Sequence, residues 1–166
     1  MRRATTSWEA EYSEYFALRA VPLRRLAYVL CGDWHLSEDL VQVTFLKLYQ
    51  HWPRIRAETV DAYSRRVLIN SYLSKTRRLR GEQIVAEVPD RAAAEVSVTE
   101  AVDLGRAMAV LTPKQRTLLA LRFIEDVSVA ETAGLLGISE GTVKSQTFRA
   151  ARTLRAHLGV YTHSEE

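Results

Sequence analysis

VSVAETAGLLGISEGTVKSQTFRAARTLRAHL, residues 127–158, decides the fold of the C-terminal part of this 166-residue chain. Ser128 followed by Glu131 is typical of a helix start, because the two residues can satisfy free amides of the first turn. Gly137 suits the end of a short helix, since glycine adopts left-handed backbone angles without a steric penalty. Ser139 can cap a second helix. The stretch therefore predicts two helices joined by a tight turn.

The second of these helices has two distinct faces. Its apolar positions recur at helical spacing and predict the side that packs on a core: Val143, Thr147, Ala150, Ala151, Leu154 and Leu158. The other side carries groups that suit base edges and phosphates: Thr142, Ser145, Gln146, Arg149 and Arg152, with Lys144 on the flank. No acidic residue follows Glu140 within the helix. These features favour a DNA-binding helix-turn-helix over the alternative, an amphipathic surface helix with a solvated basic face.

Charge is unevenly distributed along the rest of the chain, although the net formal charge is only +3. Residues 63–80 hold no acidic residue and six basic ones: Arg65, Arg66, Lys75, Arg77, Arg78 and Arg80. The charged residues of 81–103 are acidic except for Arg91. Two basic blocks separated by an acidic spacer predict two contacts with a polyanion and a linker that avoids it.

Composition argues against several other classes of function. Cys31 is the only cysteine, so no internal disulfide can form. The four histidines lack metal-ligand spacing, and we expect neither a metal nor a cofactor. No paired-carboxylate, nucleophile–base or phosphate-loop arrangement indicates an enzyme. Without an apolar run of transmembrane length or a signal peptide, we expect a soluble, cytoplasmic protein with no membrane contact.

Helical periodicity runs through most of the chain, and strand signals are nearly absent. In the N-terminal part it predicts four helices: about 8–18, Pro22 to Gly32, Ser37 to Trp52, and about 60–79. In the C-terminal part it predicts a helix over about 102–111, a helix started by Thr112, Pro113 and Gln115, and the helix-turn-helix. The expected fold is all-α: two small helical domains, residues 1–80 and 99–160, joined by a flexible linker over 81–98.

The predicted helix from Ser37 to Trp52 is apolar over more than one face. Both faces show helical spacing: Val41, Phe45, Leu48 and Trp52 on one, and Leu36, Leu40, Val43 and Leu46 on the other. Such a helix either lies at the centre of a bundle or binds something outside its own domain. Periodicity alone leaves both possibilities open.

Taken together, the segments resemble a bacterial extracytoplasmic-function (ECF) sigma factor of RNA polymerase. The resemblance covers roughly residues 15–158 and rests on SEDLVQVTFLKLYQHW (37–52), DAYSRRVLINSYLSKTRRLR (61–80) and LTPKQRTLLALRFIEDVSVAETAGLLGISEGTVKSQTFRAARTLRAHL (111–158). The helix-turn-helix alone is shared by many transcription regulators, whereas the two domains in this order are specific. The motifs SEGTVKSQ and NSYLS are similar to those of an actinobacterial, SigE-like subgroup.

The resemblance implies a sigma factor that binds core RNA polymerase and directs promoter-specific transcription initiation. In its region-2 domain, it implies docking on the β′ clamp helices through Asp39, Gln42, Phe45 and Leu46. Val43 departs from the family, where a glutamate is common. The next loop and helix would melt and read the −10 promoter element through Arg54, Arg56, Glu58 and Asn70. Phosphate contacts are then expected from Arg65, Arg66, Lys75, Arg77, Arg78 and Arg80.

In the region-4 domain, the resemblance implies that the last helix reads the −35 promoter element. The residues that match the family are Thr142, Lys144, Ser145, Gln146, Arg149 and Arg152, of which Gln146 and Arg149 are best suited to base edges. The preceding apolar helices would rest on the β flap, and an anti-sigma factor is a further candidate partner. Two rival functions remain: a self-sufficient helix-turn-helix regulator that binds a palindrome as a dimer, and a helical adaptor that binds polymerase without reading DNA.

Overall fold

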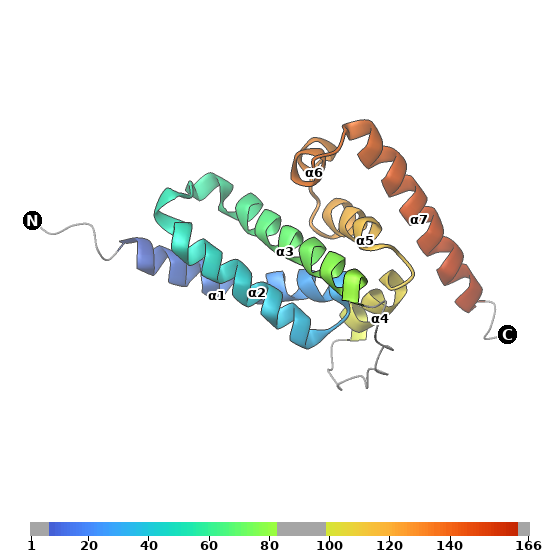
Figure 1. Cartoon of the computed structure of the whole chain (residues 1–166), viewed down its shortest axis with the longest axis horizontal. Helices are drawn as coiled ribbons and strands as arrows, with labels where there is room; N and C mark the ends of the chain where they lie inside the picture. The colour runs from blue at the N-terminus through green and yellow to red at the C-terminus, as the bar shows by residue number, and fades with distance from the viewer. Residues whose placement is uncertain (1–6, 83–98, 163–166) are drawn as a thin grey trace, which may run out of the picture. The chain divides into compact units, whose positions relative to one another are not determined.

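The computed structural model describes residues 7–82 and 99–162, and every regular element in these ranges is a helix (Figure 1). The chain divides into two compact units, Met1–Ser74 and Lys75–Glu166, which are described separately below. The all-α prediction with two helical units is confirmed. Of the predicted linker, residues 81 and 82 continue a helix, and residues 83–98 lie outside the described part of the chain.

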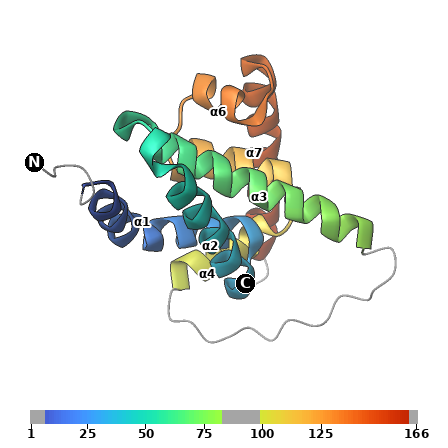
Figure 2. The same ribbon diagram turned by 60° about the vertical axis from the view of Figure 1, so that its left-hand side comes forward.

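The N-terminal helices are α1 (Ser7–Cys31), α2 (Trp34–His51) and α3 (Val60–Glu82), with two short 3-10 turns, η1 (Trp52–Arg54) and η2 (Ala57–Thr59), between α2 and α3 (Figure 2). The predicted break at Pro22 is wrong, because α1 is continuous through this residue. Proline removes one helical hydrogen bond at a cost of about 3 kcal/mol. The second half of α1 packs on α2 and buries a row of apolar side chains that offsets this cost: Leu23, Leu26, Ala27 and Leu30.

Helix α2 begins earlier than predicted. Asp33, not Ser37, is its N-cap: the Asp33 carboxylate accepts a hydrogen bond from Leu36 N at 3.1 Å. Ser37 is fully buried and donates its hydroxyl hydrogen to Asp33 O at 2.6 Å. Aspartate caps helices as well as serine does, and starting at Asp33 brings the Trp34 ring into a stack on Tyr28, with centroids 4.4 Å apart.

The C-terminal unit contains α4 (Thr99–Met108), α5 (Pro113–Leu119), the π turn η3 (Ala120–Ile124), α6 (Val129–Leu136) and α7 (Glu140–Thr162). Its predicted cap residues are confirmed. Thr112 and Gln115 form a reciprocal capping box, Ser128 Oγ accepts from Glu131 N at 3.1 Å, and Ser139 Oγ accepts from Thr142 N at 3.1 Å. Gly137 ends α6 with φ +64°, in the left-handed region.

The helix-turn-helix shares a small core with α5. Leu118, Ala133 and Val143 are buried together, and three half-buried side chains pack against them: Val129, Leu136 and Ile138. Ala150 continues the buried side of α7. The predicted core stripe stops before Leu158, which is 47% exposed.

The π turn η3 was not predicted. Glu125 N donates to Ala120 O, five residues earlier, at 2.9 Å. The wider turn keeps Leu121 in the core, while Phe123 is 69% exposed and Ile124 is 43% exposed. Such turns occur often at functional sites. An unexplained apolar surface therefore lies between α5 and α6.

Candidate nucleic-acid interface and docking helix

The exposed side of α7 carries most of the residues predicted to read the −35 element. Lys144, Ser145, Arg149 and Arg152 are exposed there, and Arg155, which we had not predicted, lies on the same side. We call these five residues the basic face of α7. It points away from the buried Val143 and Ala150, and no acidic residue of α7 follows Glu140. The face presents positive charge and hydrogen-bond donors on a rigid helix.

Two predicted DNA-binding residues are less accessible. Thr142 is half-buried, and its hydroxyl lies 2.8 Å from Ser139 Oγ, within the cap of the helix. Gln146 is also half-buried, because it lies close to the core side of α7. Thr142 therefore contributes to the helix start, and Gln146 has only part of its side chain available.

Helix α2 presents a second exposed strip, which runs along the side opposite its buried residues. Asp39, Gln42, Val43 and Leu46 are exposed at helical spacing, and we call them the outer strip of α2. Val43 is 40% exposed and Leu46 is 57% exposed. Apolar side chains that face water on a helix with an adequate buried side are a feature of binding surfaces.

Phe45 does not belong to the outer strip, which corrects its predicted role as a surface contact. Its side chain is only 3% exposed. The ring centroid lies 4.6 Å from that of Phe16 and 6.3 Å from those of Tyr12 and Tyr15. Phe45 therefore anchors α2 on α1, and the side chains that remain available to a partner are those of the outer strip.

Aromatic side chains from three elements surround the start of the loop after α2. The Trp52 ring lies 5.4 Å from the rings of both Tyr12 and Tyr15, and Tyr49 lies 5.2 Å from Tyr12. Tyr12 also donates its hydroxyl hydrogen to Phe45 O at 3.0 Å. Packing among these rings holds the chain in position at the C-terminal end of α2.

Tyr15 connects this aromatic group to the first turn of α3. Its hydroxyl donates to Asp61 Oδ1 at 2.9 Å and lies 2.9 Å from Ser64 Oγ, while Arg19 forms an ion pair with Asp61 at 2.7 Å. Burial is the main cause that raises the pKa of Tyr15 to about 12. The phenol therefore remains protonated, and able to donate, throughout the neutral range of pH.

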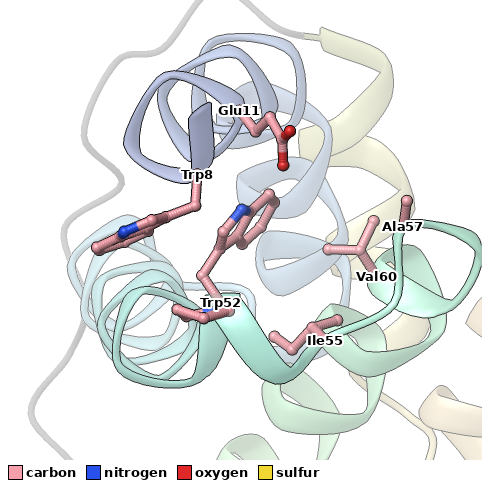
Figure 3. Close-up of a pocket in the computed structure, with 7 residues that line it drawn as sticks. Trp8, Glu11, Trp52, Ile55, Ala57 and Val60 are labelled. Atoms are coloured by element: carbon pink, nitrogen blue, oxygen red, sulfur yellow. The ribbon is translucent and has the colours of Figure 1, made fainter. Parts of the chain in front are cut away.

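A pocket of about 240 Å³ opens beside this loop. Its walls are Trp8, Glu11, Trp52, Pro53, Ile55, Ala57 and Val60. Figure 3 shows the Trp52 ring and the Glu11 carboxylate turned toward the same space, with Ile55 and Val60 on the far side. The pocket combines an aromatic surface with one acceptor group. Sequence reasoning missed Trp8 and Glu11, because they come from α1 and not from the loop.

The residues predicted to read the −10 element are exposed on the loop and on α3, but they do not line this pocket. Arg54, Arg56 and Glu58 lie on the loop, and Asn70 lies on α3. Helical spacing places Asn70 on the side of α3 away from the buried Leu68.

The basic residues of α3 do not share one face. Helical spacing places Arg66 and Arg77 with Asn70, away from the buried Leu68, whereas Lys75 falls on the side of Leu68 and is half-buried. Of the remaining basic residues, Arg65 is half-buried, while Arg78 and Arg80 are exposed on other sides of the helix axis. The six cations of this block therefore differ in how far they are accessible to a phosphate.

Residues 7–82 and 99–162 include no helix long and apolar enough to cross a membrane. The same ranges contain no group of three or more His, Cys, Asp or Glu side chains arranged to hold a metal ion. Cys31 is half-buried beside Ser37 Oγ at 3.2 Å, and burial raises the pKa of its thiol. A raised pKa disfavours the reactive thiolate at neutral pH.

Two family models match the two units. Sigma-70 region 2 matches residues 18–82, and Sigma-70, region 4 matches residues 101–154. The RNA polymerase sigma-E factor of Streptomyces avermitilis is 37% identical over 152 residues, which cover 89% of this chain and 85% of the relative. The ECF RNA polymerase sigma factor SigE of Mycolicibacterium smegmatis is 32% identical over 174 residues, which cover 98% of this chain and 65% of the relative.

Two solved structures have a fold similar to that of this chain. The sigma factor RpoE from Bartonella quintana, solved in complex with the anti-sigma factor NepR, is 25% identical with a TM-score of 0.76, covering 90% of this chain and 98% of RpoE. CnrH, solved with the cytosolic domain of CnrY, shares the fold at 21% identity and a TM-score of 0.69, covering 93% of this chain and 92% of CnrH. The helix-turn-helix, the helical unit before it and these relatives lead to one conclusion: the chain belongs to the ECF RNA polymerase sigma factors, non-enzymatic subunits that direct transcription initiation at promoters.

Proposed function

We propose that this sigma factor binds the β′ clamp helices of core RNA polymerase through the outer strip of α2. The observation that carries the proposal is the division of α2 into two apolar sides. Phe45 and Leu48 are buried, whereas Leu46 remains 57% exposed with Asp39 and Gln42 beside it. An exposed apolar centre with a polar rim is the usual composition of a protein interface. Val43 gives this interface an apolar group where the family commonly has a glutamate.

The pocket beside the loop after α2 supports a role in opening the −10 element. An unstacked base needs an aromatic surface to stack on and a polar group that recognises its edge. Trp52 supplies the surface, and the Glu11 carboxylate can accept a hydrogen bond from an exocyclic amino group. We propose that exposed residues of the loop and along α3 hold the separated strand: Arg54, Arg56, Glu58, Asn70, Arg66, Arg77, Arg78 and Arg80.

The basic face of α7 supports recognition of the −35 element in the major groove. Arg149 is exposed and can make a bidentate contact with a base, and the accessible part of Gln146 lies on the adjacent side of the helix. Arg152 and Lys144 suit phosphates. The exposed Phe123 and Ile124 give the preceding helices an apolar surface for the β flap. An anti-sigma factor is a further proposed partner, as RpoE was solved in complex with one. These contacts would take place in the cytoplasm.

Transcription with purified components tests this function. The protein is added to core RNA polymerase and genomic DNA, and the 5′ ends of the transcripts are sequenced. We expect starts that share two upstream elements and disappear when the protein is omitted. A self-sufficient regulator would instead protect a symmetric DNA site without polymerase, and that result would contradict the proposal.

Gln146→Ala is expected to relax discrimination within the −35 element. A bidentate contact with the correct base is worth about 1–3 kcal/mol, so the preference for that base should fall by about 5- to 150-fold. Competition between matched and single-base variant promoters measures this preference. Arg152→Ala is the matched control, because loss of a phosphate contact weakens all sequences alike. If Gln146→Ala also weakened all sequences alike, its role would be structural.

A further inference from the structure

Phe148 is an exposed aromatic side chain within the basic face of α7. Phe148 is 66% exposed, whereas Val143 and Ala150, on the opposite side of the helix, are fully buried. One helical turn before it lie Lys144 and Ser145, and one turn after it lies Arg152. Packing of the described part of the unit does not account for this ring, because it leaves most of its surface in water.

Helical geometry places Phe148 nearer the middle of the exposed side than Gln146. With 3.6 residues per turn, Phe148 lies about 60° from Ser145 and about 40° from Arg152 around the helix axis. Gln146 lies about 100° from Ser145, toward the core, and is half-buried. A surface that approached α7 along its basic face would therefore meet Phe148 before Gln146.

Gly141 lies on the same side of the helix, two turns before Phe148. It is exposed, and an added Cβ would meet only Ser139 Oγ, at 4.0 Å. The internal packing of the described residues therefore leaves room for a larger residue at this position. Because Gly141 has no side chain, nothing protrudes from the N-terminal part of the basic face, two turns from the Phe148 ring, which suits close approach by an external surface.

We propose that Phe148 recognises a thymine of the −35 element through its C5-methyl group in the major groove. This inference rests on the proposed role of α7. The thymine methyl is the apolar group that base edges present there, and phenylalanine is among the side chains that contact it. If the ring lay over a polar group of a base edge, it would displace water from that group without replacing the hydrogen bonds that the water made. The surrounding cations favour a polyanion over an apolar protein as the occupant of this face.

Deoxyuridine scanning tests the proposal. Each thymine of a −35 element found by transcript mapping is replaced in turn by deoxyuridine, which removes the methyl and keeps every hydrogen-bonding group. Binding by holoenzyme with the full chain is measured for the wild type, Phe148→Ala and Val110→Ala. At one position we expect the wild type to lose about fourfold in affinity, the value of one buried methyl-sized group. Phe148→Ala should lose nothing further there, and Val110→Ala, which changes an exposed apolar residue of the same unit outside α7, should keep the fourfold ratio.

Three results would overturn the role of Phe148. The first is a −35 element without thymine, and the second is a wild type that is indifferent to every deoxyuridine. The third is a Phe148→Ala variant that loses affinity equally for matched and scrambled elements, as expected for a sugar contact. In all three cases the proposed function would remain intact if holoenzyme still preferred the matched −35 element and Gln146→Ala reduced that preference. Absence of any preference between matched and scrambled −35 elements would contradict the proposed function itself.

Discussion

Phe45→Ala is expected to lower the free energy of unfolding of the N-terminal unit by about 3–5 kcal/mol. The ring is 3% exposed and is enclosed by Tyr12, Tyr15 and Phe16, so alanine would leave a cavity between rigid rings. Denaturant titration followed by tryptophan fluorescence measures the change selectively. The chain has three tryptophans, Trp8, Trp34 and Trp52, and all of them lie in this unit.

Phe45→Leu is the matched control for this experiment, because a branched aliphatic side chain fills much of the same space. We expect it to be destabilised less than the alanine variant. An unchanged unfolding transition in Phe45→Ala, together with weaker binding to core polymerase, would contradict the buried position. The predicted role of Phe45 as a direct surface contact would then be correct.

Leu46→Asp is expected to weaken binding to core polymerase by about 100-fold or more, because docking would bury a carboxylate with no counter-charge in an apolar interface. The fold should be unaffected, since Leu46 is 57% exposed. Titration of labelled core enzyme with the variant measures the affinity, and tryptophan fluorescence checks the unfolding transition.

Leu18→Asp provides the matched control, because Leu18 is 74% exposed on α1 of the same unit and lies outside the outer strip of α2. We expect this variant to bind polymerase as the wild type does. If Leu46→Asp bound polymerase as tightly as the wild type, the outer strip would not be the docking surface. A loss of binding by both variants to the same degree would point to a general effect of added negative charge.

The features that the sequence predicted well depend on neighbouring residues only. Thr112, Ser128 and Ser139 act as caps through bonds to amides three residues ahead, and Gly137 adopts the left-handed backbone that its lack of a side chain permits. Local chemistry decides such positions. Pro22 is different, because its local cost is offset by packing of α1 on α2, which no short window of sequence contains.

The errors at the candidate sites have the same origin. Phe45 and Leu46 are adjacent and both apolar, and only the position of α1 decides that the first is buried and the second exposed. The π turn at Ala120–Ile124 departs from the 3.6-residue period on which the sequence reading depends. The sequence could have indicated Phe148, since this aromatic residue lies off the apolar stripe of α7. Its exposure could be known only from the folded structure.

One side chain, Tyr15, restrains both ends of the loop between α2 and α3. Its ring contacts Trp52, where the loop begins, and its hydroxyl bonds Asp61, just after the loop ends. Fixing both ends lowers the conformational entropy of the free loop before any ligand arrives. Part of the ordering cost of binding is therefore met during folding, and a preorganised loop binds more tightly for the same contacts. The contacts of Tyr15 with η1 and α3 thus contribute to affinity at a surface that neither Tyr15 nor Asp61 needs to touch.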